Sequence, residues 1–174
     1  MAGRWWEIHC AFAGIQGGIM ILPEEQYAKI MEVLPILCVD IMIQNPEGEY
    51  LLIKRVNEPL KGQWWVIGGR VFKGETLKEA AIRKVREEVG LHIRDLKLVG
   101  YYEDTKEKSP FGLSTPQHSV SVVFSAVVAH DQRICLDAQS SEWKFSKLLP
   151  ERFRCVLDES RKEPVCWASR RVGD

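Results

Sequence analysis

Residues 68–91, GGRVFKGETLKEAAIRKVREEVGL, decide how the rest of the chain is interpreted. The stretch opens with two glycines and continues as a predicted helix over residues 76–89, whose apolar positions recur at the spacing of a helix that lies against a sheet. It ends with Glu87, Glu88 and a glycine that stops the helix. Two carboxylates at the C-terminal end of a helix are unfavourable, because that end of the helix dipole prefers cations. A divalent ion would satisfy both carboxylates, yet Lys84, one turn earlier, can reach the same place.

Length, charge and cysteine usage limit the class of protein. A chain of 174 residues is large enough for one domain with a full hydrophobic core. Its 24 Lys and Arg residues balance 24 Asp and Glu residues, which argues against nucleic acid or an acidic membrane as the partner. Apolar runs fall short of the ~20 residues that cross a bilayer. Cys38 and Cys135 lie in apolar runs and are predicted to be reduced, buried thiols of a cytoplasmic protein.

The order of predicted elements indicates a layered fold. Residues 1–21 are interpreted as an N-terminal lead-in without an assigned function, and residues 22–170 as a single domain. Helices are predicted at 22–34, 76–89 and in part of 147–170; strands at 36–44, 50–55, 96–103, 118–129, 132–136 and 142–146; and loops at 56–67 and 104–117. This order predicts an α/β or α+β fold with a mixed sheet between helices.

Other residues of the central stretch and the first strand suggest a phosphate ligand. Gly68 and Gly69 allow the backbone to approach a ligand closely, and Arg70 can bind phosphate oxygens. Carboxylate ligands suit Mg²⁺ or Mn²⁺, with phosphate oxygens completing the shell. Asp40 lies within an apolar strand, so its carboxylate needs a partner.

The central stretch resembles the signature of the Nudix hydrolases, G-x5-E-x7-R-E-U-x-E-E-x-G-U, in which U is a bulky aliphatic residue. The matching residues are Gly69, Glu75, Arg83, Val85, Glu87, Glu88, Gly90 and Leu91. Lys84 departs from the pattern, because it stands where the family has the first glutamate of the helix. Three carboxylates can hold two or more metal ions, whereas two carboxylates beside an ammonium group favour one. The resemblance implies a Nudix fold and a metal-dependent hydrolase.

Within that family the chain is similar to the GDP-mannose mannosyl hydrolases over roughly residues 22–150, a subfamily that also lacks the first helix glutamate. The similarity includes the hairpin NPEGEYLLIKR, the loop NEPLKGQWW and the segment GGRVFKGETL. It implies that the substrate is a small nucleotide sugar, GDP-mannose or a related GDP-hexose. It also implies a Mg²⁺ cofactor, with Mn²⁺ as an alternative, and a homodimer. The reaction implied is attack of water on the sugar carbon, which releases GDP and the free sugar.

The resemblance also implies residue roles. Gly68, Glu88 and Gln139 match the ligands of a single Mg²⁺, and Glu87 is either a further ligand or a group that orients water. Substrate-binding residues are predicted to be Arg55, Arg70 and Asp40, and the catalytic residues Arg83, Glu87 and Asp40. Arg83 has a simpler alternative, which is pairing with a glutamate of its own helix.

One departure leaves the reaction open. The subfamily places its general-base histidine directly after the glutamine, where this sequence has Ser140. Asp137, Glu142 and His118 are the candidate replacements. The alternatives are therefore hydrolysis at the sugar carbon, attack at phosphorus in a nucleoside diphosphate derivative, and a nucleotide-binding module with weak activity.

Overall fold

The computed structural model describes residues 23–106, 116–128 and 132–158 of the chain. The predicted lead-in, residues 1–21, lies outside the described residues, as does the part of the predicted C-terminal helical region beyond residue 158.

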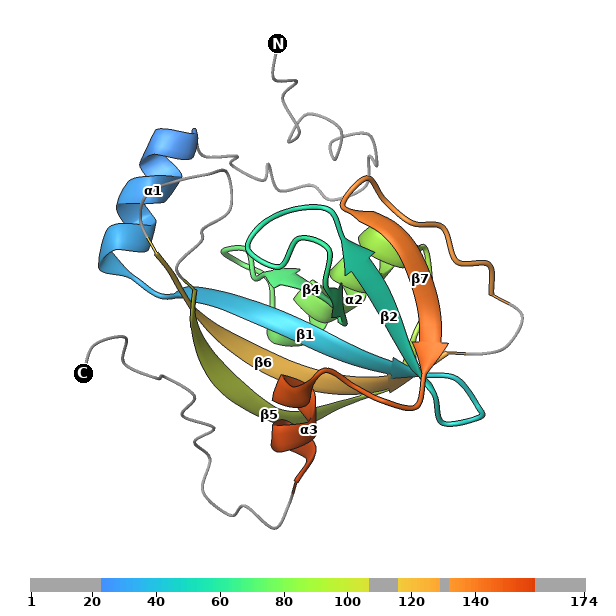
Figure 1. The fold of residues 1–174 in the computed structure, drawn as a ribbon. Helices are drawn as coiled ribbons and strands as arrows, with labels where there is room; N and C mark the ends of the chain where they lie inside the picture. The colour runs from blue at the N-terminus through green and yellow to red at the C-terminus, as the bar shows by residue number, and fades with distance from the viewer. Residues whose placement is uncertain (1–22, 107–115, 129–131, 159–174) are drawn as a thin grey trace, which may run out of the picture.

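Ten helices and strands follow one another in these residues (Figure 1). They are α1 (Glu24–Val33), β1 (Ile36–Gln44), β2 (Tyr50–Arg55), β3 (Trp64–Trp65), β4 (Ile67–Arg70), α2 (Leu77–Val89), β5 (Arg94–Lys106), β6 (Gln117–Val127), β7 (Ser140–Ser146) and α3 (Glu151–Leu157). Helix α1 projects from one end of the sheet.

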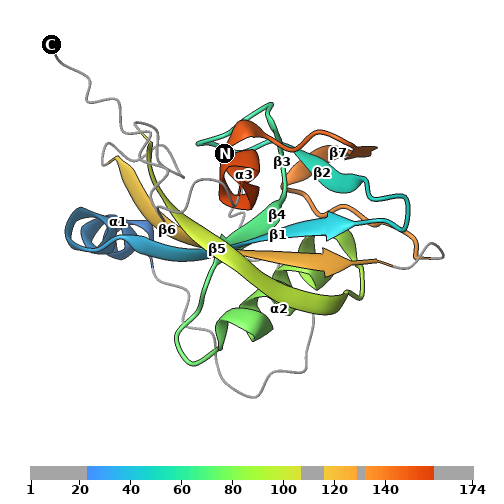
Figure 2. The ribbon, with the colours of Figure 1, turned by 90° about the horizontal axis from the view of Figure 1, so that it is seen from below.

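The strands form one mixed sheet, as the sequence predicts. Its main order is β3-β2-β1-β6-β5, with β4 pairing to β1 and β7 pairing to β2. Strands β1 and β6 are parallel over nine residue pairs, whereas β5 and β6 are antiparallel. Helix α2 covers one face of the sheet and α3 lies against the other, so the sheet is sandwiched between helices (Figure 2).

Strand β1 forms the centre of both cores because both of its faces are covered. Val39, Ile41 and Ile43 pack on the α2 side and are fully buried. Met42 packs on the α3 side, where Phe153 is fully buried as well. Burial on both faces explains why this strand is an almost continuous apolar run. Asp40 shares the face of Met42, because side chains alternate along a strand.

Helix α2 is defined at both ends by its own sequence. Thr76 and Glu79 form a capping box, in which each side chain accepts a hydrogen bond from the backbone N–H of the other residue. Gly90 ends the helix with φ 71°, a left-handed conformation that glycine adopts without strain. Between them, Ala80, Ala81, Val85 and Val89 are buried against the sheet.

Three expectations about local structure are wrong. Residues 132–136 form no strand; Cys135 and Asp137 instead donate backbone N–H groups to the carbonyls of Val89 and Glu88, which end α2. Cys135 is consequently exposed, not buried, while Cys38 is half-buried. Residues 64–65 and 67, expected in the loop of residues 56–67, lie in strands β3 (Trp64–Trp65) and β4 (Ile67–Arg70).

No helix within the described residues is long and apolar enough to cross a membrane.

Candidate active site

The glycine pair lies where two functional side chains approach the backbone from opposite sides. Antiparallel pairing of β4 with β1 places Gly68 opposite Asp40. A Cβ at Gly68 would collide with Asp40 Oδ1, and a Cβ at Gly69 would lie 2.8 Å from Lys84 Cε. At Gly68 the Val39 carbonyl oxygen would also lie 2.5 Å away, and because this is a backbone atom, glycine is required there for steric reasons. At Gly69 the close neighbour is the end of the Lys84 side chain, so the pair lies between the cleft on the Asp40 side and helix α2 on the Lys84 side.

Asp40 has the partner that its place in an apolar strand requires. The Tyr102 hydroxyl donates a 2.7 Å hydrogen bond to Asp40 Oδ2, and Ser121 forms a second side-chain hydrogen bond. The carboxyl is 6% exposed. Burial raises the pKa of Asp40, and the hydrogen bonds from Tyr102 and Ser121 oppose that rise.

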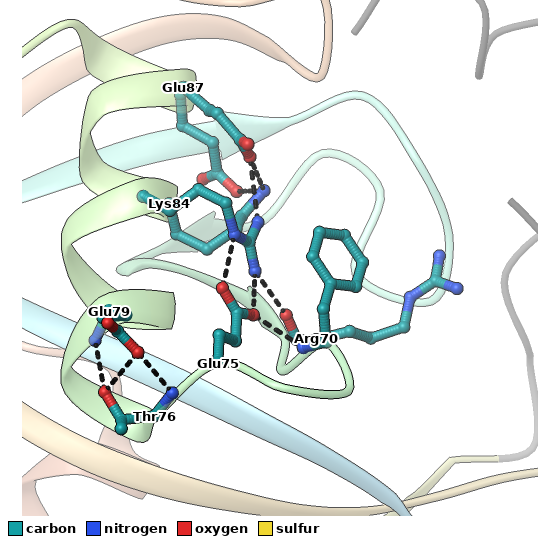
Figure 3. A network of polar contacts seen from close by, with 9 residues as sticks. Arg70, Glu75, Thr76, Glu79, Lys84 and Glu87 are labelled. Atoms are coloured by element: carbon teal, nitrogen blue, oxygen red, sulfur yellow. Dashed lines mark hydrogen bonds and ion pairs between the residues drawn. The ribbon is translucent and has the colours of Figure 1, made fainter. Parts of the chain in front are cut away.

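A cleft of about 130 Å³ opens above the glycine pair. It gathers residues that are far apart in the sequence, from β1, β2, β4, β5 and β6. Four of the predicted site residues line it: Asp40, Arg55, Gly68 and Arg70. Arg70 extends away from α2 (Figure 3), and its guanidinium stacks on the ring of Tyr27 in α1 at 4.4 Å.

A closed network of charges, which we call the α2 network, joins Glu75 in the turn before α2 to four residues of the helix: Arg83, Lys84, Glu87 and Glu88. Figure 3 shows this network, with Glu75, Lys84 and Glu87 labelled. The Lys84 ammonium lies 2.7 Å from Glu88 Oε1 and 3.5 Å from Glu87 Oε2. Lys84 thus reaches the place that the sequence indicated. Burial by itself would lower the pKa of Lys84, but the carboxylates of Glu88 and Glu87 outweigh burial and raise it. Lys84 is therefore an ammonium group that neutralises the end of the helix.

Arg83 links the turn before α2 to the helix through ion pairs and a hydrogen bond. Its guanidinium lies 2.6 Å from Glu75 Oε1 and 3.1 Å from Glu87 Oε2, and it donates a 3.0 Å hydrogen bond to the Arg70 carbonyl. It also lies 4.1 Å from the centre of the Phe72 ring. Arg83 does not line the cleft described above. The contacts correspond to the simpler alternative for Arg83, although Glu75 joins Glu87 as its partner.

Gln139 is brought to the same helix end by the loop before β7. Its backbone N–H and its side-chain amide each donate a 2.9 Å hydrogen bond to the Asp137 carboxylate. Asp137 in turn donates its backbone N–H to the Glu88 carbonyl at 3.0 Å. The fold therefore gathers Gln139, Asp137, Glu87 and Glu88 around the C-terminal end of α2.

These oxygen donors suit one divalent ion better than several. The predicted ligands belong to β4 (Gly68), to α2 (Glu87 and Glu88) and to the loop before β7 (Gln139). Among the described residues, no group of three or more His, Cys, Asp or Glu side chains is arranged to hold a metal. Lys84 already neutralises Glu88, so the residues fit a single Mg²⁺ or Mn²⁺ whose ligands include amide or backbone oxygens.

The three candidate bases lie in different places. His118 is exposed on β6, and its neighbours Gln117 and Ser119 line the cleft in its stead. Glu142 forms an exposed 2.7 Å ion pair with Lys54. Asp137 is next to Glu88, at the helix end. None of the three lines the cleft, and Asp137 differs from the other two because it lies next to Glu88, a predicted metal ligand.

Two unpartnered atoms lie beside the loop that carries Gln139. Arg55 and Ser140 are paired across β2 and β7. Within the described part of the chain, Arg55 Nε and Ser140 Oγ are buried without a hydrogen-bond partner. Both atoms can donate a hydrogen bond to a ligand oxygen, which fits the predicted role of Arg55 toward phosphate.

The sequence analysis missed one wall of the cleft. Six side chains of β5 and β6 line it as three cross-strand pairs, which we call the polar ladder: Tyr102 with Ser121, Asp104 with Ser119, and Lys106 with Gln117. Residues 102–106, YEDTK, are polar at every position, and residues 117–121, QHSVS, are polar at all positions except Val120. Segments that are polar on both faces have no period-two pattern to mark one face as a cleft wall, so the sequence carried no signal that could have found the ladder.

Comparison with known proteins supports the family that the fold and the site indicate. The model of the NUDIX domain matches residues 34–164. The chain therefore belongs to the Nudix family, and the relatives below are consistent with a Nudix hydrolase. Nudix hydrolases generally use divalent metal ions.

Individual relatives agree with this assignment. The low-salt glycan biosynthesis protein Agl8 of Haloferax volcanii is 33% identical over 123 residues, which are 71% of this chain and 78% of Agl8. The ADP-ribose pyrophosphatase of Methanocaldococcus jannaschii is 35% identical over 118 residues, which are 67% of this chain and 66% of that protein. The crystal structure of a MutT protein from Methanosarcina mazei superimposes with a TM-score of 0.57 at 26% identity, covering 75% of this chain and 96% of that one.

Proposed function

We propose that this protein is a Mg²⁺-dependent Nudix hydrolase that acts on a nucleotide sugar, GDP-mannose or a related GDP-hexose, and releases GDP and the free sugar. The observation that carries the proposal is the composition of the cleft. Arg55, Arg70 and Lys106 supply positive charge, while Asp40 and Asp104 supply acceptors for hydroxyl groups. A diphosphate linked to a polyhydroxyl group needs both kinds of partner.

The diphosphate is expected to lie over the glycine pair. Arg55 and Arg70 line the cleft at Gly68 and Gly69, and Arg55 has an unpartnered Nε. Charge grows on a diphosphate as it leaves, so guanidinium groups held here stabilise the departing nucleotide. Mg²⁺ bound by Gly68, Glu87, Glu88 and Gln139 would supply further stabilisation of that negative charge. Glu87 and Asp40 are the proposed catalytic carboxylates, and Arg83 positions Glu87 through their 3.1 Å contact.

The relatives support a substrate of this class without specifying it. One is named for glycan biosynthesis and another for hydrolysis of ADP-ribose, which is itself a nucleoside diphosphate linked to a sugar. The homodimer and the cytoplasmic location implied by the resemblance belong to the same proposal. Size-exclusion chromatography with light scattering tests the dimer.

A second candidate is attack at phosphorus, which would give a nucleotide and a sugar phosphate. It is favoured by the position of two base candidates: Asp137 and Glu87 lie at the end of α2 beside Glu88, a predicted metal ligand, whereas His118 is exposed on β6. The loss of the histidine that Ser140 replaces points the same way.

Turnover of GDP-mannose with Mg²⁺ in ¹⁸O-labelled water separates these reactions, with the label read by mass spectrometry. The proposal expects label in free mannose and unlabelled GDP. Label in GMP or in mannose phosphate would show attack at phosphorus and overturn the first candidate. EDTA is expected to abolish turnover, and a Glu25→Gln variant, altered on exposed α1, is the matched protein control.

If GDP-mannose is neither hydrolysed nor bound, a panel of nucleotide sugars that includes ADP-ribose and UDP-glucose should be tested. Turnover of another compound in the panel would change the proposed base or sugar of the substrate and keep the proposed class of reaction. Binding without turnover across the whole panel would overturn the hydrolase proposal and favour a nucleotide-binding module.

A further inference from the structure

The polar ladder forms one wall of the cleft, yet only Asp104 and Lys106 of its six residues have a role in the function proposed above. Its three pairs follow one another along β5 and β6, with Tyr102 and Ser121 at the inner end and Lys106 and Gln117 at the outer end. Tyr102 is bonded to Asp40, which faces Gly68 across the β1–β4 pairing. The ladder therefore begins beside the place proposed for the diphosphate and leads away from it.

Most ladder groups already have protein partners. Asp104 accepts a 2.9 Å hydrogen bond from Arg152 of α3 and also pairs with Lys106. Gln117 differs, because its Oε1 is buried and lacks a hydrogen-bond partner within the described structure. A buried acceptor without a partner costs about 1–3 kcal/mol, so it is completed by an ordered water molecule or by a ligand. Because Gln117 lines the cleft, a ligand that donates an O–H or N–H group at the outer end of the ladder can take that place.

The chemistry around Gln117 favours sugar hydroxyls over a nucleobase. A base needs an open aromatic or flat apolar surface to stack on. Trp65 is the indole that lines the cleft, but Lys106 Nζ lies 5.6 Å from its ring centre and Phe153 packs against it at 5.0 Å. A hexose hydroxyl both donates and accepts, which suits a wall where an amide acceptor stands beside an ammonium donor.

We propose that the polar ladder is the sugar subsite of the cleft, and that Gln117 Oε1 accepts a hydrogen bond from a hydroxyl of the substrate's sugar. This inference rests on the proposed function, because it takes a nucleotide sugar as the ligand. Gln117 is then a specificity residue: it distinguishes a sugar-linked nucleoside diphosphate from the free nucleoside diphosphate.

The test is a Gln117→Met variant, which keeps the length of the side chain and removes the amide. Equilibrium dissociation constants are measured by calorimetry for GDP-mannose and for GDP, with Ca²⁺ in place of Mg²⁺ to slow turnover. We expect the affinity for GDP-mannose to fall about 3–10-fold, as for loss of one hydrogen bond, and the affinity for GDP to stay at the wild-type value. Thermal stability should be equal or higher, because the unpartnered acceptor is gone.

His118→Ala is the matched control, because His118 is the next residue of β6 and is exposed outside the cleft. It should leave both affinities unchanged.

Other outcomes overturn the inference. Equal weakening of GDP and GDP-mannose would show that Gln117 contacts the nucleotide and not the sugar. A loss of stability with unchanged affinities would make Gln117 a structural residue. If Gln117→Met binds GDP-mannose with the wild-type affinity, the proposed sugar subsite is refuted. The proposed hydrolase function would be unaffected, because the ¹⁸O assay tests it independently. A wild-type protein that binds GDP but neither binds nor hydrolyses any nucleotide sugar would refute the proposed function itself.

Discussion

The two sides of the Gly68–Gly69 pair differ in how their polar groups are satisfied. On the α2 side, Lys84, Glu87 and Glu88 form a network in which every charge has a partner of opposite sign. On the cleft side, Arg55 and Gln117 each keep a buried atom without a partner in the described structure. The α2 network comes from one continuous stretch, while the cleft assembles residues from strands far apart in sequence.

This difference separates scaffold from binding surface. A buried charge must be neutralised within the protein, or it destabilises the fold. A binding surface instead retains unpaired donors and acceptors, because a ligand supplies their partners. A mutation that leaves a buried charge of the α2 network without its partner should therefore lower stability, in addition to any effect on the proposed metal site, whereas mutations in the cleft should act mainly on affinity.

The largest effect on stability should come from Lys84→Met, which removes a cation of the α2 network. Lys84 is 8% exposed and Glu88 is 4% exposed, so the variant leaves a buried carboxylate without its cation. Removing one partner of a buried ion pair costs about 3–5 kcal/mol. Urea unfolding in EDTA should show this loss, and added Mg²⁺ should recover part of it by neutralising Glu88.

Lys78→Met is the control for this variant, because Lys78 is exposed on the same helix. The double variant Lys84→Met/Glu88→Met should recover most of the lost stability, since no charge is left buried. If Lys84→Met unfolds at the same midpoint urea concentration as the wild type, the buried Glu88 carboxylate does not need Lys84 for its stability in the fold.

An intermediate effect, on ligand affinity, is expected from Arg55→Met in the cleft. Hydrogen bonds to charged groups contribute about 1.5–3 kcal/mol, so affinity should fall roughly 10–100-fold. GDP and GDP-mannose should be weakened alike, because Arg55 is proposed to bind the diphosphate that both share. This pattern contrasts with Gln117→Met, which should affect GDP-mannose alone.

Lys54→Met is the matched control for Arg55. It replaces the residue that precedes Arg55 in β2 and removes an ammonium group that pairs with exposed Glu142 at 2.7 Å. Binding should stay close to the wild-type value. A stronger effect of Arg55→Met on GDP-mannose than on GDP would instead move Arg55 to the sugar end of the cleft.

The smallest effect concerns the pH dependence of the α2 network. Partial burial would raise the pKa of Glu75, but hydrogen bonds from Arg83 and from the Phe72 N–H outweigh burial and lower it below the usual 4.5. A lowered pKa in the folded state contributes stability above pH ~4.5, and that contribution is lost as pH falls through the folded value. Melting temperatures of Glu75→Gln and wild type should therefore differ most near pH 7 and converge near pH 3.

Glu25→Gln, in an exposed i,i+4 pair with Lys29, is the control for this titration and should show little change at any pH. A gap between Glu75→Gln and wild type that stays constant down to pH 3 would mean that Glu75 acts through packing and not through its charge.

Much of the fold could be predicted from local patterns. The strand at 36–44 and the helix at 76–89 agree with β1 and α2 to within a residue, because burial on both faces and a capping box leave direct marks in the sequence. The prediction of a strand at 132–136 was wrong because the backbone partners of this segment leave no mark in its local sequence. Its apolar residues pack against the core while its backbone bonds to the end of α2, a partner that no local pattern reveals.

For the site, the sequence by itself determined the α2 network. On a helix, residues three and four positions apart are neighbours, so the approach of Lys84 to Glu87 and Glu88 follows from spacing alone. The tertiary structure decided the cleft. Only the pairing of β5 with β6, and of β2 with β7, brings Gln117 to Lys106 and Ser140 to Arg55, and excludes His118 from the cleft. Strand register is set by the whole sheet and core, and one residue of slip would exchange the two faces of a strand.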